Sequence, residues 1–349
     1  MNPVIEKDTD RIIADAGDLL EELRGRTVLV TGPYGMLASY LVFTMIRMNE
    51  MSPDRPVRIL AAGRSEEKLR ARFGSYADRP WFTFLKTDLC SPLHVDGPVD
   101  YIIHAASHAS PDHYSKDPVG VTLPNTAGTL HLLELAAQKK SHSLLFFSSG
   151  EIYGKVNSPV IREDEGGFLD PAQVRSCYGE SKRMGETLCA SFAYQYGVPA
   201  KIVRPSHTYG PTMDPEHDTR VFAAFVSDAL GGRDIAMTSD GTASRCFIYI
   251  ADAAAAYFRV LLRGKAGEAY NVTNPEGVIT IYELAKLIAG LVPEKKLKVT
   301  RKEPPEGYMD RGKNAYTRLD TQKLEALGFR CRVPLEEGFR RTLEAFRQK

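Results

Sequence analysis

Two residues four positions apart, Tyr178 and Lys182, could carry acid–base chemistry. On a helix this spacing places both side chains on one face. A neighbouring ammonium would lower the pKa of the tyrosine, which makes it a usable acid or base. A second pair with this spacing, Tyr282 and Lys286, lies on an amphipathic segment far along the chain, and we interpret that pair as structural.

A hydroxyl and a carboxylate, Ser149 and Glu151, follow an apolar segment that predicts a strand over 143–148. If the backbone stays extended beyond that strand, alternate side chains point to one side. Both groups would then face one pocket beside Tyr178. The alternative interpretation is a serine next to a turn and a solvated glutamate.

A glycine-containing turn connects an apolar segment over 27–31 to a predicted helix over 37–48. Its glycines permit a tight turn and let the backbone approach a pyrophosphate at the helix N-terminus. Ala38 takes the third small position of the pattern and still permits close packing of the helix on the strand. We therefore expect a dinucleotide cradle formed by Gly32, Tyr34, Gly35, Met36 and Leu37.

The second predicted strand, over 57–61, is followed by Arg64 rather than by the acid that usually binds the ribose of NAD. Arg64 could bind a 2′-phosphate, stack on adenine or point into solvent. Asp88 ends another predicted strand and could accept a hydrogen bond from the adenine amine. NAD is the expected cofactor, and NADP is the alternative.

Strand and helix patterns alternate from residue 26 to residue 205. Such alternation predicts a parallel sheet covered by helices on both faces, which is an α/β fold of the doubly wound Rossmann type. The predicted strands lie at 27–31, 57–61, 82–86, 101–104, 143–148 and 201–204, and the predicted helices at 37–48, 65–73, 120–139 and 178–196.

After residue 205 the alternation loosens, which indicates a smaller α/β substrate domain that is partly interleaved with the first. Its predicted elements are a helix over 221–230, a strand over 246–250, an alanine-rich helix, and helices over 280–291 and 320–327. Apolar residues at helical spacing over 4–24 predict one amphipathic helix ahead of the sheet. We thus expect an N-terminal extension (1–25), a dinucleotide-binding domain (26–205) and a substrate domain (206–349).

The composition argues against several classes of protein. Lys and Arg number 45 against 44 Asp and Glu, a net charge of +1, so a nucleic-acid-coating protein is not expected. The 5 cysteines form no C-x-x-C pair, and His104 and His108 lack a carboxylate between them, so no metal site is expected. We find no signal peptide and no apolar run of membrane length, and we expect a cytoplasmic protein.

Taken in order, these segments resemble the extended short-chain dehydrogenases/reductases of the NAD-dependent epimerase/dehydratase family, which act on nucleotide sugars. The resemblance runs from Arg26 to the C-terminus. Within the family, 109–114, 175–178 and the spacing from Arg220 to Arg245 are most similar to UDP-glucuronate decarboxylases. The other motifs that carry it are the glycine turn, 104–107, 125–129, 148–154, Tyr178 with Lys182, 204–211 and 245–249.

The resemblance implies a role for each group of residues. Ser149 and Tyr178 would polarise the C4 hydroxyl of the sugar, and Glu151 would act near C5 and C6. Lys182 would tune Tyr178 and hold the nicotinamide ribose. His207 departs from the family, which usually has an asparagine there. The sugar nucleotide would contact Ser110, Tyr114, His207, Arg220, Arg245 and Arg311, and the cofactor would also contact Leu89, Ala105, Ala106, Ser107 and Asn125.

Glu151 favours a decarboxylase or a 4,6-dehydratase over a 4-epimerase, because elimination at C5 or C6 needs a further acid or base. The favoured function is therefore a UDP-glucuronate decarboxylase-like enzyme that uses NAD(H) through a 4-keto intermediate. An NADPH-dependent keto-sugar reductase, suggested by Arg64, and a non-catalytic nucleotide-binding protein are further alternatives. The resemblance also implies a homodimer through the helices expected over 120–139 and 178–196.

Overall fold

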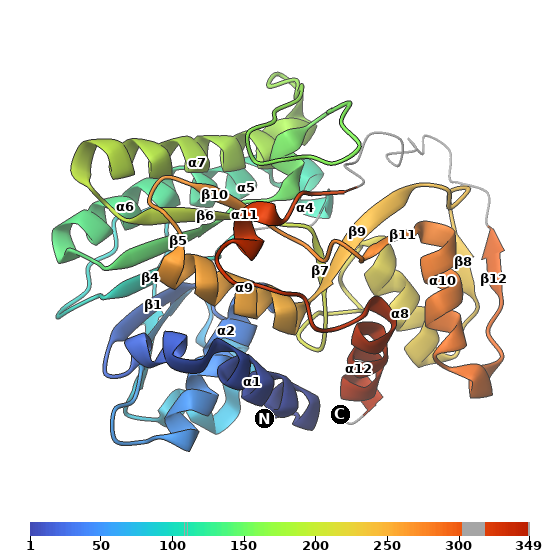
Figure 1. Ribbon diagram of the computed structural model, residues 1–349, viewed down its shortest axis with the longest axis horizontal. Coiled ribbons are helices and arrows are strands. Elements are labelled where there is room, and N and C mark those ends of the chain that lie inside the picture. Colours follow the sequence, from blue (N-terminus) through green and yellow to red (C-terminus); the bar gives the residue numbers. More distant parts are fainter. Residues whose placement is uncertain (108, 110, 302–317, 348–349) are drawn as a thin grey trace.

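The computed structural model describes residues 1–107, 109, 111–301 and 318–347. A large sheet with helices on both faces is joined to a smaller lobe of short strands and helices (Figure 1). The predicted α/β fold of the Rossmann type, with a smaller α/β lobe beside it, is confirmed.

The large sheet has seven parallel strands in the order β10-β6-β5-β4-β1-β2-β3. Every residue of β1, β4 and β5 is buried, as expected for strands that are covered on both faces. The strand order reverses between β1 and β4, so a ligand crevice is expected outside the carboxyl ends of these strands. The strands are β1 (Thr27–Thr31), β2 (Arg58–Gly63), β3 (Phe82–Lys86), β4 (Tyr101–His104), β5 (Ser143–Phe147), β6 (Ala200–Pro205) and β10 (Ala269–Val272).

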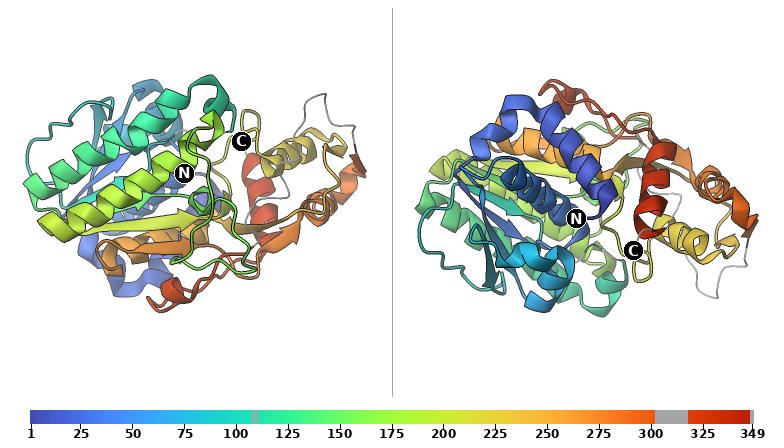
Figure 2. Two further views of the ribbon diagram at one scale, coloured as in Figure 1. Left: turned by 90° about the horizontal axis from the view of Figure 1, so that it is seen from above. Right: turned by 90° about the horizontal axis from the view of Figure 1, so that it is seen from below.

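Helices form a layer on each face of this sheet (Figure 2). Seen from above, α6 and α7 lie over one face, and α5 contacts both of them. Seen from below, α1, α2 and α9 contact one another over the other face. Each layer buries its own apolar core. The helices are α1 (Pro3–Ala16), α2 (Met36–Met51), α3 (Glu66–Phe73), α4 (Pro111–Lys116), α5 (Pro118–Asn125), α6 (Ala127–Lys139), α7 (Cys177–Tyr196) and α9 (Ile250–Arg263).

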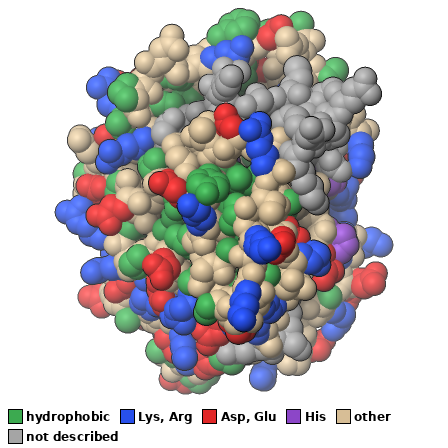
Figure 3. All heavy atoms as spheres, turned by 90° about the vertical axis from the view of Figure 1, so that its right-hand side faces the viewer, with side chains coloured by type: hydrophobic (Ala, Val, Ile, Leu, Met, Phe, Trp, Pro, Cys, Tyr) green, Lys and Arg blue, Asp and Glu red, His purple; other side chains and the backbone are tan. Residues whose placement is uncertain are grey.

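The smaller lobe is built on two short sheets with the strand orders β11-β9-β7 and β12-β8. On the face shown in Figure 3, the Lys and Arg side chains are interspersed with Asp and Glu rather than gathered in one patch. None of the helices in the described parts of the chain is long and apolar enough to cross a membrane. The elements are β7 (His207–Tyr209), α8 (Val221–Gly231), β8 (Ile235–Met237), β9 (Ser244–Tyr249), β11 (Val278–Thr280), α10 (Ile281–Gly290), β12 (Val299–Arg301), α11 (Gln322–Glu325) and α12 (Leu335–Arg347).

Two helices that the sequence predicts as continuous are divided in the structure. The helix expected over 4–24 ends at Ala16, because Gly17 takes a φ of 53° and the chain continues as a 3₁₀-helix, η1 (Gly17–Leu23). The helix expected over 120–139 is broken between α5 and α6. Pro124, which has no N–H to donate, stands in the last turn of α5 and explains this break.

A buried carboxylate ties the N-terminal helix to the last helix. Asp8 of α1 is 1% exposed. Its carboxylate accepts hydrogen bonds from the hydroxyls of Tyr40 (2.6 Å) and Tyr249 (2.5 Å) and from Arg341 Nη1 (2.7 Å). These partners belong to α2, β9 and α12, so one side chain connects both lobes, and the two ends of the chain lie close together (Figure 1).

Candidate functional site

The turn between β1 and α2 leaves room for a ligand against the backbone. Gly32 has a φ of 63°, and a Cβ at this position would lie 2.8 Å from the Cα of Ala106. α2 begins at Met36, and its N-cap residue, Gly35, makes no capping hydrogen bond through a side chain. The first N–H groups of a helix have no partner within the helix, so they can bind a pyrophosphate here. The turn consists of the residues that the sequence predicts for a dinucleotide cradle.

The residues expected at the adenosine end of the cofactor lie together beyond β2 and β3. The hydroxyl of Tyr34 accepts a hydrogen bond from the backbone N–H of Arg64 (3.3 Å). Asp88 Oδ1 accepts a hydrogen bond from the N–H of Cys90 (3.0 Å). This hydrogen bond and, to a lesser degree, the charge of Arg64 lower the pKa of Asp88. Arg64 and Asp88 are therefore near neighbours, as a site that surrounds adenosine requires.

Two buried polar atoms beyond β4 fit a bound dinucleotide. Asn125 Nδ2 donates hydrogen bonds to the carbonyl of Val121 (3.0 Å) and to Ser181 Oγ (3.0 Å). Asn125 Oδ1 and Ser107 Oγ are buried without a hydrogen-bond partner among the residues that the structure describes. Buried polar atoms normally have partners, so these two atoms indicate a place for a ligand or an ordered water. Together with the cradle at Gly32, they show that the residues present fit this cofactor.

Tyr178 and Lys182 lie near the start of α7, within the helix predicted over 178–196, and both side chains are buried. Lys182 Nζ donates a hydrogen bond to the carbonyl of Phe147 (2.6 Å) and lies 5.7 Å from the centroid of the Tyr178 ring. Burial lowers the pKa of Lys182 to about 7, against the opposing charge of Glu186. Burial raises the pKa of Tyr178 to about 12, and a hydrogen bond with Ser149 opposes this rise.

The backbone after β5 is not extended, so the prediction that Ser149 and Glu151 alternate along a strand is wrong. A 3₁₀-helix, η3 (Gly150–Tyr153), begins here, and Ser149 is its N-cap residue. Ser149 Oγ accepts a hydrogen bond from the N–H of Glu151 (3.2 Å), and such local bonds compete with extended structure. Both groups still reach Tyr178, Ser149 by a hydrogen bond and Glu151 through its charge, which raises the pKa of Tyr178.

Of the residues expected to bind the sugar nucleotide, Tyr114 and Arg220 are close enough to Tyr178 to act on it. Tyr114 of α4 stacks on Tyr178 with ring centroids 4.9 Å apart. Burial lowers the pKa of His207 to about 3, and the charges of Arg245 and Arg220 add to this effect, so the three side chains are neighbours. The charge of Arg220 also lowers the pKa of Tyr178. Two further predicted residues, Ser110 and Arg311, lie outside the described residues.

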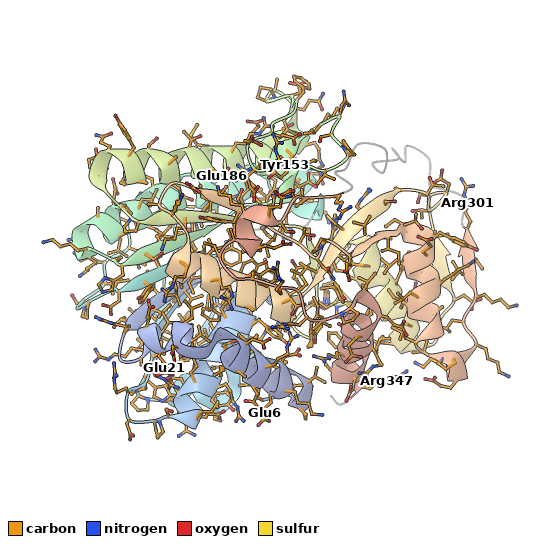
Figure 4. All side chains as sticks on the ribbon, viewed as in Figure 1. Glu6, Glu21, Tyr153, Glu186, Arg301 and Arg347 are labelled. Atoms are coloured by element: carbon orange, nitrogen blue, oxygen red, sulfur yellow. The ribbon has the colours of Figure 1, made fainter. Side chains whose placement is uncertain are left out.

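The sequence motifs did not assign a role to Glu186, whose carboxylate binds the side chains of Arg204 and Ser148. It accepts hydrogen bonds from Arg204 Nε (2.9 Å) and Nη2 (2.6 Å) and from Ser148 Oγ. Arg204 also donates to the hydroxyl of Tyr153 (2.9 Å), and Figure 4 shows Glu186 and Tyr153 on the same side of the molecule. The available signal was its position, one helical turn after Lys182 on the same face of α7.

Arg175 was part of a motif in the sequence but had no assigned role. It lies in a 3₁₀-turn, η4 (Val174–Ser176), directly before α7. Its Nη2 lies 3.3 Å from Glu151 Oε2, and its guanidinium carbon is 4.8 Å from the centroid of the Tyr114 ring. Arg175 therefore contacts two candidate site residues at once. Its position three residues before Tyr178 was the only available signal.

Comparison with known proteins agrees with this geometry. Residues 28–273 match the family model described as the NAD dependent epimerase/dehydratase family. UDP-glucuronic acid decarboxylase 6 of Arabidopsis thaliana is 32% identical over 322 residues, which cover 92% of this chain and 88% of the relative. UDP-glucuronic acid decarboxylase 1 of Danio rerio is 31% identical over 328 residues, which cover 94% of this chain and 74% of the relative. The resemblance expected from the motifs is confirmed.

Two solved structures share the fold. UDP-glucose 4-epimerase from Thermotoga maritima aligns with a TM-score of 0.77 at 24% identity, over 92% of this chain and 99% of the other. A dTDP-glucose 4,6-dehydratase from Streptomyces venezuelae, solved with NAD bound, aligns with a TM-score of 0.75 at 24% identity. That alignment covers 92% of this chain and 97% of the other.

Proposed function

Because the chain belongs to the NAD-dependent epimerase/dehydratase family, we propose that it is a decarboxylase of UDP-glucuronate that works through a 4-keto sugar. The observation that carries this proposal is a carboxylate, Glu151, whose charge acts on Tyr178 and whose backbone N–H donates a hydrogen bond to Ser149 Oγ. A 4-epimerase needs only the hydroxyl pair, whereas chemistry at C5 and C6 needs a further acid or base. The relatives named as UDP-glucuronic acid decarboxylases support the same reaction.

Ser149, Tyr178 and Lys182 each contribute to the first step, the oxidation of the sugar at C4. Ser149 and Tyr178 bind the C4 hydroxyl, and Tyr178 accepts its proton. Lys182, whose amine is held by the carbonyl of Phe147, places a cation next to Tyr178 when it is protonated and so favours the phenolate. Gly32, Met36 and Asn125 would hold NAD, which would supply the reversible acceptor for the hydride at C4.

The 4-ketone converts the C6 carboxylate into that of a β-keto acid. The bond between C5 and C6 breaks, its electron pair forms the enolate of the ketone, and CO₂ leaves. A proton then adds at C5, and Glu151 is our candidate for its donor or for the residue that positions a donating water. Tyr178 finally returns its proton to the oxygen at C4, and a proton from solvent replaces the one added at C5, so the protein ends in its starting state.

Incubation with four candidate sugar nucleotides, followed by mass spectrometry, tests the proposal. UDP-glucuronate should lose the mass of CO₂, while UDP-glucose, dTDP-glucose and GDP-mannose should stay unchanged. Loss of the mass of water from a neutral sugar would identify a dehydratase, and altered stereochemistry at constant mass an epimerase. Net consumption of added NADPH would identify a reductase, the alternative that Arg64 suggests. Absence of CO₂ release from UDP-glucuronate would contradict the proposal.

We also propose that two copies of the chain pair through α5 and α7. These helices contact each other, and they carry exposed apolar side chains: Val119 is 64% exposed and Met184 is 51% exposed. Apolar side chains that stand together on adjacent helices are typical of an interface. Light scattering should give twice the mass of one chain, and Met184→Glu should shift the protein toward the monomer. A monomeric parent protein would contradict this assignment.

A further inference from the structure

Arg175 stands at the outer end of a column of side chains that ends on Tyr178. Its guanidinium carbon lies 4.8 Å from the centroid of the Tyr114 ring. Tyr114 in turn stacks on Tyr178, with centroids 4.9 Å apart and an angle of 15° between the rings. Three separate elements, η4, α4 and α7, thus bring one cation and two aromatic rings together directly beside the candidate catalytic hydroxyl.

The polar partner of Arg175 is Glu151, and this pairing is weak. The atoms Nη2 and Oε2 are 3.3 Å apart, at the long end of a hydrogen bond. The two side chains are 43% and 44% exposed, so water competes with the contact, and exposed pairs of this kind contribute little stability. A guanidinium has five N–H donors, and a carboxylate can bind it through two parallel hydrogen bonds. A second carboxylate that arrives here can therefore replace Glu151.

The substrate of the proposed reaction brings such a carboxylate to this place. Its C4 hydroxyl must lie against Tyr178, and the C6 carboxylate is attached to C5, the next carbon of the ring. Burial raises the pKa of Tyr114 and of Tyr178, and the charge of Glu151 raises both further, so Glu151 lies within electrostatic range of both rings. Arg175, which pairs with Glu151, therefore lies on the same side of the two rings as Glu151.

We propose that Arg175 binds the C6 carboxylate of the sugar. When the substrate binds, Arg175 releases Glu151 and pairs with the substrate carboxylate. It pairs with Glu151 again after that carboxylate has left as CO₂. This inference rests on the proposed decarboxylase function. A sugar with a neutral hydroxymethyl group at C6 offers no anion to replace Glu151. The exchange therefore selects the acid over its neutral counterpart, and it weakens the hold on the product once the carboxylate is lost.

Calorimetric titration of an enzyme with strongly reduced turnover tests this assignment. In a Tyr178→Phe background, the dissociation constants of UDP-glucuronate and UDP-glucose are measured with and without Arg175→Gln. We expect Arg175→Gln to weaken UDP-glucuronate binding by about 10- to 100-fold, the usual effect of losing a hydrogen bond to a charged group, and to leave UDP-glucose within about twofold. Arg162→Gln, which removes an exposed arginine from a loop, should change neither constant.

A second variant protects the test against a simple loss of fold. Glu151→Gln removes the carboxylate that competes for Arg175, so it should strengthen UDP-glucuronate binding and leave UDP-glucose binding unchanged. A damaged protein does not gain affinity for one sugar alone. Arg175→Lys keeps the charge but not the planar donor pair, and should recover part of the lost affinity.

The outcomes separate this assignment from the proposed function. If Arg175→Gln loses affinity equally for UDP-glucuronate and UDP-glucose, Arg175 only supports the Tyr114 stack. That result would overturn the assignment of Arg175 but not the proposed function. An unchanged affinity for UDP-glucuronate would overturn the assignment as well. If the enzyme with Arg175 intact binds UDP-glucuronate no better than UDP-glucose and the wild type releases no CO₂, the proposed function fails, and the assignment fails with it.

Discussion

Gly32 and Ala106 approach so closely that a methyl group on Gly32 would lie 2.8 Å from the Cα of Ala106. This contact between the first turn and the segment after β4 closes the cradle in which the dinucleotide is expected. Both partners are backbone, so neither can move aside as a flexible side chain would.

Gly32→Ala should therefore weaken binding of NAD, with at least a tenfold rise in its dissociation constant, and lower the melting temperature. Gly74→Ala is the matched control, because Gly74 has a similar φ of 55° but no atom within 4 Å of its added Cβ. The control should lose only about 1–2 kcal/mol of folding stability, which is the cost of strain in a left-handed backbone. Titration with NAD, followed by fluorescence, compares the two, and equal affinities would contradict the expected cradle.

Tyr178→Phe should reduce turnover of UDP-glucuronate by about 10²- to 10⁴-fold, the usual contribution of one proton-transfer group. The phenyl ring keeps the stack on Tyr114, so the melting temperature and NAD binding should stay close to those of the wild type. Tyr282→Phe, in the second pair with the same spacing, should leave turnover unchanged. Coupled measurement of CO₂ release distinguishes these variants, and an active Tyr178→Phe enzyme would remove Tyr178 from the mechanism.

Lys182→Met should make the protein more stable at neutral pH while abolishing turnover. Burial lowers the pKa of Lys182 to about 7, whereas an unfolded chain keeps it near 10.5, so between these values only the unfolded state holds the proton. Stability of the wild type therefore rises with pH across this window, by up to about 1.4 kcal/mol per pH unit from this group. Urea unfolding at several pH values measures the slope. Lys182→Met should make the dependence of stability on pH less steep, whereas Lys286→Met should leave it unchanged.

The protein should lose stability in acid as pH falls from 6.5 toward 3. Burial lowers the pKa of His104 and of His207 to about 3, so in this range the unfolded state binds protons that the folded state does not. His207→Asn should remove part of this acid sensitivity, and substitution of the exposed His94 by Asn should leave it unchanged. Thermal unfolding between pH 7 and pH 4 gives the comparison, and parallel curves for all three proteins would refute the explanation.

Asp8→Ala should destabilise the fold by about 3 kcal/mol, because it leaves Tyr40, Tyr249 and Arg341 without their shared acceptor. Asp10→Ala, two residues away on the same helix, removes only a partly exposed pair with Arg47 and should cost less than about 1 kcal/mol. Urea unfolding of both variants tests this difference. Equal losses would mean that α1 is held by its apolar face alone.

The central sheet was predictable because its strands are apolar runs bounded by glycine or by polar turns. Segments such as 27–31 and 101–104 are buried on both faces, and an apolar run is the pattern that such buried strands show in the sequence. The short strands β8, β11 and β12 have three residues each and exist only through pairing with distant segments. No local pattern predicts such pairing.

The site was predictable where one element carries two functional groups, as α7 does for Tyr178 and Lys182. It was not predictable where the position depends on a local hydrogen bond or on packing between elements. Ser149 turns the chain by capping η3 instead of continuing β5, which an alternation rule does not detect. The stack of Tyr114 on Tyr178 requires α4 to pack against α5 and η4, next to the start of α7, and the sequence motifs contain no information about that packing.

The hydrogen bond between Asp8 and Arg341 joins residues 333 positions apart. During synthesis, α1 can dock on α2 early, but its buried carboxylate lacks its partner Arg341 until α12 has left the ribosome. α1 contacts α12 as well as α2 and α9, so part of its cover arrives only with that last contact. A nascent chain that stalls before α12 emerges would expose this helix and be a natural target for chaperones and proteases.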